Sequence, residues 1–180
     1  VSVVGDDAEG RAAADLARKA CGEAASMIRA AGRVTPSKIR YVSNTQQMFC
    51  VDRNPEPGLA QPVQDEVLSV VERALPGADV VILSDYGRGV LQADLIARII
   101  AAARSQGVAV SVDPRGSDFT RYDGARVIKP NADELAAETG LPVTSDGEAE
   151  TALAALKARL PETEALLVTR GAAGMCLLDG

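Results

Sequence analysis

The sequence has no histidine and no tryptophan, and three tyrosines and two phenylalanines are its only aromatic residues. Without histidine, and with Cys21, Cys50 and Cys176 too far apart for a C-x-x-C motif, a zinc site is not expected. Three scattered cysteines also argue against a disulfide framework, so we expect a reducing, cytoplasmic location. No apolar stretch approaches the roughly 20 residues needed to cross a bilayer, and we expect no membrane partner.

The charge and the apolar composition limit the protein class further. Nineteen basic and 25 acidic residues give a net charge of -6, which argues against nucleic acid as the main partner. Hydrophobic residues make up 47% of the 180 residues but aromatic residues only 3%, so Ala, Val, Leu and Ile must build the core. That composition suits helices packed on a buried parallel sheet.

Strand and helix patterns alternate along most of the chain. We expect a strand at 1–4, a helix at 8–20, more helix at 24–31, and an antiparallel pair at 38–43 and 47–52, before a loop at 54–58. From residue 61 a helix runs to just before Pro76, and the later pattern predicts strands at 80–83, 108–112, 127–128, 165–168 and 175–178, with helices at 91–107, 131–139 and 147–160. The alternation predicts an α/β three-layer fold with a mostly parallel sheet and a small β lid at about 34–53.

Short polar motifs follow these expected strands, where open α/β sheets place their ligand sites. Each motif also has a simpler interpretation as a turn shaped by glycine or proline, with its arginine in solvent. The motifs are Asp85-Tyr86-Gly87-Arg88-Gly89, Asp113-Pro114-Arg115-Gly116 and Thr169-Arg170-Gly171 with Gly174.

The segment Asn131-Ala132-Asp133-Glu134 opens an expected helix directly after a strand. Asparagine followed three residues later by glutamate is a capping box, which is sufficient to explain both residues. The start of a helix also attracts anions, and Glu134 is suited to hold a hydrated magnesium ion beside a phosphate chain. The two interpretations are compatible.

Lys38, Arg40, Gln46 and Gln47 lie in the expected antiparallel pair. Charged side chains on an exposed hairpin can serve only to prevent edge-to-edge aggregation. Alternatively, the pair is a lid whose basic and amide groups reach over a phosphorylated substrate.

Taken in order, these segments resemble the ribokinase-like (PfkB) carbohydrate kinases, and within them the heptose 7-phosphate kinases. The resemblance is strongest in four strings: L-S-D-Y-G-R-G, D-P-R-G-S-D-F-x-R-Y, K-P-N-x-x-E and L-L-V-T-R-G-x-x-G-M. It implies transfer of the ATP γ-phosphoryl group, with Mg²⁺, to D-glycero-D-manno-heptose 7-phosphate, giving the 1,7-bisphosphate for ADP-heptose and lipopolysaccharide core synthesis.

The resemblance also assigns roles to residues. It places Asn131, Ala132, Asp133, Glu134, Thr169, Gly171 and Gly174 beside the nucleotide, with Glu134 also at the metal, and Lys38, Arg40, Gln47, Asp85 and Arg88 beside the sugar phosphate. It further implies a homodimer formed through the β lid.

The resemblance places the catalytic Asp in a later G-A-G-D-like segment, which we expect beyond Gly180. The chain therefore resembles a fragment of a kinase domain, and we expect little or no turnover from it alone. Two alternatives stay open: a non-catalytic nucleotide-binding or dimerisation module, and a ribokinase-like kinase for another sugar.

Overall fold

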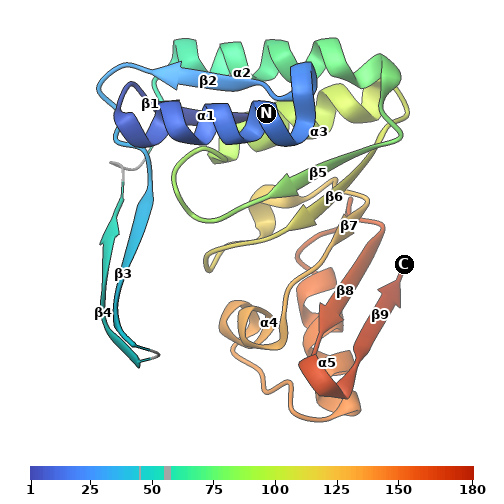
Figure 1. Cartoon of the computed structure of the whole chain (residues 1–180). Helices are drawn as coiled ribbons and strands as arrows, with labels where there is room; N and C mark the ends of the chain where they lie inside the picture. The colour runs from blue at the N-terminus through green and yellow to red at the C-terminus, as the bar shows by residue number, and fades with distance from the viewer. Residues whose placement is uncertain (45, 55–57) are drawn as a thin grey trace. The chain divides into compact units, whose positions relative to one another are not determined.

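The computed structural model describes residues 1–44, 46–54 and 58–180. These residues form two compact units, which are treated separately: unit 1 is Val1–Val71 with Arg88–Gln92, and unit 2 is Glu72–Gly87 with Ala93–Gly180. Within the described ranges, no helix is both long enough and apolar enough to span a membrane. Figure 1 gives the labels of the elements.

Unit 1 begins with a short parallel strand pair. β1 (Ser2–Gly5) pairs with β2 (Met27–Ala30), and α1 (Ala8–Cys21) connects them through the 3₁₀ turn Gly22–Ala24. The strand at 1–4 and the helix at 8–20 are confirmed, whereas the helix predicted at 24–31 is wrong. Alanine favours helix in that segment, but Ile28 and Ala30 alternate with exposed Arg29 and are buried in pairing with β1. Tertiary pairing therefore overrides the local propensity.

Asp7 fixes the start of α1 to a later segment of unit 1. Its carboxylate accepts hydrogen bonds from the Gly10 amide (2.7 Å), the Thr35 amide (2.8 Å) and the Thr35 hydroxyl (2.6 Å). The hydrogen bond from the Thr35 hydroxyl, reinforced by that from its amide, lowers the pKa of Asp7 to about 2. The Gly5 amide donates to the same hydroxyl at 2.8 Å, so Thr35 joins the end of β1 to the cap of α1.

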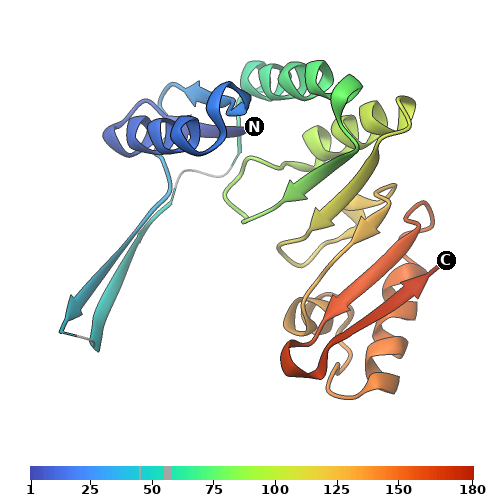
Figure 2. The same cartoon turned by 45° about the vertical axis from the view of Figure 1, so that its right-hand side comes forward.

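The predicted antiparallel pair is confirmed as β3 (Ser37–Ser43) and β4 (Gln46–Arg53). Both views show it as a long ribbon extending away from α1 (Figures 1 and 2). Asn44, in the predicted turn, has a φ of 53°; Thr45, in the same turn, and residues 55–57 of the predicted loop lie outside the described residues.

Helix α2 (Gln61–Ala74) begins in unit 1 and ends in unit 2, followed by a 3₁₀ turn at Leu75–Gly77. The prediction that this helix stops before Pro76 is confirmed.

Unit 2 contains a five-stranded sheet in the order β5-β6-β7-β8-β9, in which the first four strands are parallel and β9 is antiparallel to β8. The mostly parallel sheet is thus confirmed. Its strands are β5 (Val80–Ser84), β6 (Ala109–Asp113), β7 (Val127–Ile128), β8 (Ala165–Thr169) and β9 (Met175–Asp179). The remaining elements are α3 (Ala93–Ser105), α4 (Ala132–Thr139), α5 (Asp146–Lys157) and the 3₁₀ turns Thr120–Tyr122 and Gly171–Ala173.

The core of unit 2 lies between one face of this sheet and its helices. The side chains of Val112, Ile128 and Leu166 are in register on that face and are fully buried. The helices contribute fully buried Leu95, Ile96, Leu135, Leu153 and Leu156. Branched aliphatic side chains fill this core, as expected for a parallel sheet under helices.

Candidate functional site

The carboxyl ends of the four parallel strands meet at one edge of the unit 2 sheet, called the carboxyl edge below. Backbone hydrogen bonds continue past the strand ends: the Asp85 amide donates to the Asp113 carbonyl (3.0 Å), and the Thr169 amide donates to the Pro130 carbonyl (3.0 Å). These bonds hold the loops after neighbouring strands side by side. Open α/β sheets bind ligands at this edge.

The first predicted site residue on this edge, Asp85, is buried, with its side chain only 4% exposed. One carboxylate oxygen accepts from Arg121 Nη2 and from the Tyr122 hydroxyl, both at 2.8 Å. The other accepts from the Gly87 amide at 2.7 Å. Asp85 therefore has all its protein partners within the edge, and its contribution is to hold the loops after β5 and β6 together.

Tyr122 is the centre of this network. Its side chain is fully buried, and burial raises the pKa of its hydroxyl to about 12, with the hydrogen bond to Asp85 acting in the same direction. The guanidinium of Arg121 lies over its ring, 4.7 Å from the ring centroid. A neutral hydroxyl is kept as a donor to the carboxylate at any ordinary pH.

Two more cations pair with carboxylates along the same edge. Lys129 Nζ lies 2.8 Å from Asp113 Oδ1, and Arg115 Nη1 lies 3.3 Å from Glu134 Oε1. Glu134 is the more enclosed member of its pair, with a side chain 17% exposed against 60% for Arg115. The edge thus presents two solvent-accessible positive groups next to the start of α4.

The predicted capping box at the start of α4 is confirmed. The Asn131 side chain accepts from the Glu134 amide, and Glu134 Oε2 accepts from the Asn131 amide, both at 2.9 Å. Ala132 and Asp133 form the first turn, which leaves its amides at the edge. Because Asn131 also forms a bridge with Thr169, the structure brings the two predicted nucleotide segments together.

The loop after β8 is open. Gly171 and Gly174 have φ values of 56° and 82°, and a Cβ built on either glycine would meet no atom within 4 Å. A flat ligand can therefore approach the backbone of this loop closely.

Lys38, Arg40, Gln47 and Arg88 belong to unit 1. Lys38 forms an ion pair with Asp52 at 3.0 Å, and the hydrogen bond from Lys38 lowers the pKa of Asp52. The Arg88 guanidinium donates to the Asn54 side chain, at the base of the hairpin.

The register of the hairpin separates its two faces, because alternate residues of a strand point to opposite sides. Lys38 and Arg40 lie on one face, opposite Asp52 and Cys50. Gln47 pairs with Val42, beyond a bulge.

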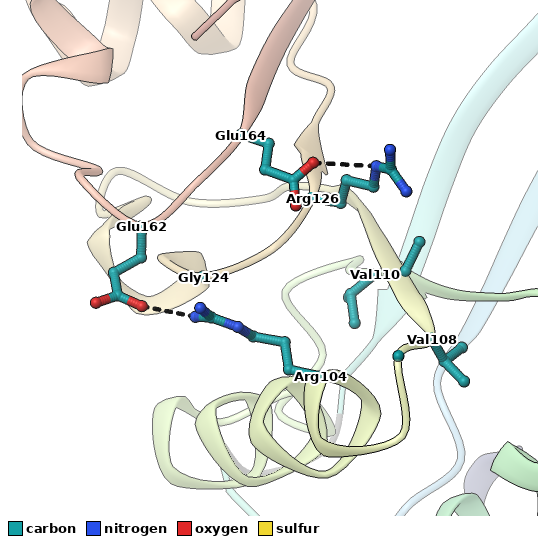
Figure 3. Close-up of a pocket in the computed structure, with 9 residues that line it drawn as sticks. Arg104, Val108, Val110, Gly124, Arg126, Glu162 and Glu164 are labelled. Carbon is teal, nitrogen blue, oxygen red and sulfur yellow. Dashed lines mark hydrogen bonds and ion pairs between the residues drawn. The ribbon is translucent and has the colours of Figure 1, made fainter.

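A pocket of about 230 Å³ lies at the opposite edge of the unit 2 sheet, where β6, β7 and β8 begin. Figure 3 shows two ion pairs in its wall: Arg104 with Glu162 at 2.6 Å and Arg126 with Glu164 at 3.1 Å. All four side chains are more than half exposed. The residues predicted to bind the nucleotide lie at the carboxyl edge instead, and we place the candidate site there.

The sequence interpretation did not select several residues of the edge as site residues. Asp113 and Arg115 belong to one of the polar motifs, and Lys129, Arg121 and Tyr122 belong to the strings that carry the family resemblance. For Asp113, Arg115 and Lys129 the available signal was their position at or just after the ends of β6 and β7. No local pattern links Tyr122 to Asp85, 37 residues earlier.

Glu134 is the candidate metal ligand at the carboxyl edge. Within the part of the chain that the structure describes, no three His, Cys, Asp or Glu side chains gather as a metal-binding cluster. Magnesium in proteins is commonly held through one or two carboxylates together with substrate phosphates. Glu134, enclosed and at the start of a helix, fits that kind of site.

Three comparisons place this geometry among known proteins. The Caulobacter vibrioides "Bifunctional protein HldE" is 42% identical over 98% of this chain, and the protein of the same name from Gluconacetobacter diazotrophicus is 37% identical over 99%. The chain spans 36% and 37% of the length of these relatives.

The structure of Arabidopsis thaliana ribokinase complexed with ribose and ATP matches 99% of this chain and 57% of its own, with a TM-score of 0.73 and 21% identity. This likeness shows the ribokinase-like α/β fold, as predicted. The model of the pfkB family carbohydrate kinases matches residues 1–180. The chain therefore belongs to the pfkB family of carbohydrate kinases.

Proposed function

We propose that this chain is the nucleotide-binding part of an ATP- and Mg²⁺-dependent sugar kinase that acts on D-glycero-D-manno-heptose 7-phosphate, in the supply of ADP-heptose for lipopolysaccharide core. The observation that carries the proposal is the convergence of Asn131, Glu134 and Thr169 with Arg115 and Lys129 at one edge of a ribokinase-like sheet. The names of the relatives at 37–42% identity support the heptose branch.

The nucleotide would lie with its phosphates at the first turn of α4. Asn131, Ala132 and Asp133 offer the free end of the helix, where the dipole favours anions. Glu134 would hold magnesium, which neutralises phosphate charge. Thr169 ends β8, and Gly171 and Gly174 lie in the open loop that follows it, against which the nucleoside would rest.

The phosphorylated sugar would be contacted by Lys38, Arg40, Gln47 and Arg88. Lys38 and Arg40 share one face of the hairpin, which supports a lid that carries positive charge over a sugar phosphate. Asp85 would act indirectly, because both of its carboxylate oxygens already accept hydrogen bonds, from Arg121, Tyr122 and the Gly87 amide.

The capping boxes of α4 and α5 provide a matched test. Ser145 and Glu148 cap α5 with the same pair of reciprocal hydrogen bonds as Asn131 and Glu134 in α4. In calorimetric titration with ATP and Mg²⁺, we expect Glu134→Gln to weaken binding about tenfold and to reduce its Mg²⁺ dependence. Glu148→Gln should lose similar stability and bind ATP as the parent does. Equal effects of the two variants, or no ATP binding by the folded parent, would contradict the nucleotide site.

The sugar is tested by ADP release with D-glycero-D-manno-heptose 7-phosphate, alongside ribose and fructose 6-phosphate. The 180 residues contain no G-A-G-D segment, so we expect turnover by this chain to be weak or absent. The alternative function for this chain is a nucleotide-binding module without chemistry. Strong turnover on the heptose phosphate would exclude that candidate, and turnover on another sugar alone would overturn the heptose assignment.

We also propose that the β3–β4 hairpin forms a homodimer through its apolar face. Ile39, Tyr41, Phe49 and Val51 share that face, and each is at least 44% exposed. The rings of Tyr41 and Phe49 stack with centroids 4.3 Å apart. Phe49→Ser should convert a dimer to a monomer in sedimentation. Leu16→Ser, at a residue on α1 that is 65% exposed against 55% for Phe49, should not. A monomeric parent would overturn the dimer.

The free thiols of Cys21, Cys50 and Cys176 support the cytoplasmic location that we propose for this kinase.

A further inference from the structure

Arg115 leaves the end of β6 with its backbone fixed on both sides. The Arg115 amide donates to the hydroxyl of buried Tyr122 at 3.3 Å, and the Arg115 carbonyl accepts from the Arg121 guanidinium. The same hydroxyl and guanidinium are bound to Asp85. The base of this side chain is therefore set by a buried network and not by a mobile loop.

The stem of Arg115 then passes over Gly87. A Cβ built at Gly87 would lie 3.3 Å from Arg115 Cγ, and the Gly87 φ of 64° also disfavours any other residue. The turn after β5 thus defines the path of the arginine toward α4.

The tip of Arg115 is different, because it is solvent-accessible and weakly held. Its Nη1 lies 3.3 Å from Glu134 Oε1, and the Arg115 side chain is 60% exposed. Ion pairs of this exposure contribute about 1 kcal/mol or less, so the guanidinium can exchange one anion for another at small cost.

We propose that Arg115 is a phosphate-binding residue of the nucleotide site, which moves from Glu134 to the phosphate chain when nucleotide binds. This inference rests on the proposed nucleotide site at α4. Once Glu134 holds magnesium, Arg115 loses its carboxylate partner, and its planar fork of donors becomes available to phosphate oxygens. The Asp85–Tyr122 network then acts as a positioning device for this arginine.

The experiment compares Arg115→Gln with Arg126→Gln in calorimetric titrations of the whole chain. Arg126 is a matched control, because it is 63% exposed, is paired with Glu164 at 3.1 Å, and lies at the opposite edge of the sheet. With Mg²⁺ present, Arg115→Gln should bind ATP about tenfold or more weakly, as expected for a lost charge-assisted hydrogen bond. Arg115→Lys should recover part of this loss, and Arg126→Gln should bind ATP as the parent does.

Two further ligands serve as controls. Adenosine separates the loss of a phosphate contact from a folding defect, and heptose 7-phosphate separates nucleotide phosphate from sugar phosphate. Adenosine, which has no phosphate, should bind Arg115→Gln and the parent equally. Heptose 7-phosphate should bind both equally as well.

Equal weakening of ATP and adenosine, or weakening of the sugar phosphate alone, would overturn the role of Arg115. Unchanged ATP affinity in Arg115→Gln would overturn it while leaving the nucleotide site intact. A folded parent that binds no ATP would overturn both.

Discussion

The two edges of the five-stranded sheet in unit 2 carry the same kinds of charged pairs but enclose them differently. At the carboxyl edge, Asp85 and Glu134 are 4% and 17% exposed beside Arg121 and Arg115. At the opposite edge, Glu162 and Glu164 are 59% and 64% exposed beside their arginines. The N–O distances of these four ion pairs do not follow their burial, because the exposed pair Arg104–Glu162 is the shortest.

The difference in exposure separates ion pairs that the folded structure requires from pairs that form at the surface and contribute little. A buried carboxylate needs its partners, because an unpaired charge in the interior is strongly disfavoured. An exposed pair adds little, since water screens it and holding two long side chains costs entropy. Of the two edges, the one where the parallel strands end holds the enclosed carboxylates.

The largest expected effect is at Asp85. Asp85→Asn removes the charge opposite Arg121, whose side chain is only 24% exposed, and we expect unfolding in urea to show a loss of about 3 kcal/mol. Glu162→Gln is the control at the opposite edge and should cost less than about 1 kcal/mol. Similar losses in the two variants would remove the distinction between the edges.

Tyr122→Phe should have the next largest effect, a loss of about 1–2 kcal/mol, because a buried hydrogen bond to a carboxylate disappears. The pKa of Tyr122 is raised from 10.0 to about 12, so the folded state retains the proton more tightly than the unfolded state. Its contribution to stability is therefore complete below pH 10 and is lost as the pH rises toward 12.

Thermal unfolding between pH 9 and 12 tests this dependence. Tyr122→Phe should flatten the alkaline fall in melting temperature, and Tyr86→Phe, 75% exposed, should leave it as in the parent. An alkaline fall that is unchanged in Tyr122→Phe would argue against the buried phenol.

Glycines at the two edges allow a finer comparison. Gly87 and Gly107 have similar φ values of 64° and 72°, so alanine at either should cost about 1 kcal/mol. A Cβ at Gly107 meets nothing within 4 Å, whereas one at Gly87 lies 3.3 Å from Arg115 Cγ. Of the two variants, only Gly87→Ala should therefore also weaken ATP binding, by a few-fold in calorimetry. Equal ATP affinities in the two variants would separate Gly87 from the arginine.

The smallest effect is expected for Arg104→Gln. Its pair with Glu162 is exposed on both sides, so the loss should be below about 0.5 kcal/mol and should vanish in high salt. A larger loss in urea unfolding, insensitive to salt, would show that the opposite edge is structurally constrained too.

Much of unit 2 could be predicted from the sequence because its signals are local. Apolar runs bounded by glycine and proline located every strand from β5 to β9, and the spacing of Asn131 and Glu134 located the start of α4. The prediction for 24–31 was wrong because it also rested on local signals. The alanines of that segment favour a helix, and only pairing with β1 makes it a strand.

The sequence by itself determined the alternation of strands and helices, and therefore that the polar motifs end on a common edge of a parallel sheet. Only the tertiary structure decided which charges meet there: Asp85 with Tyr122, and Arg115 with Glu134. The physical reason is the separation of the interacting residues along the sequence. Periodicity and capping depend on neighbours within a few residues, whereas these pairs join segments 37 and 19 residues apart, whose separation is closed only by packing of the core.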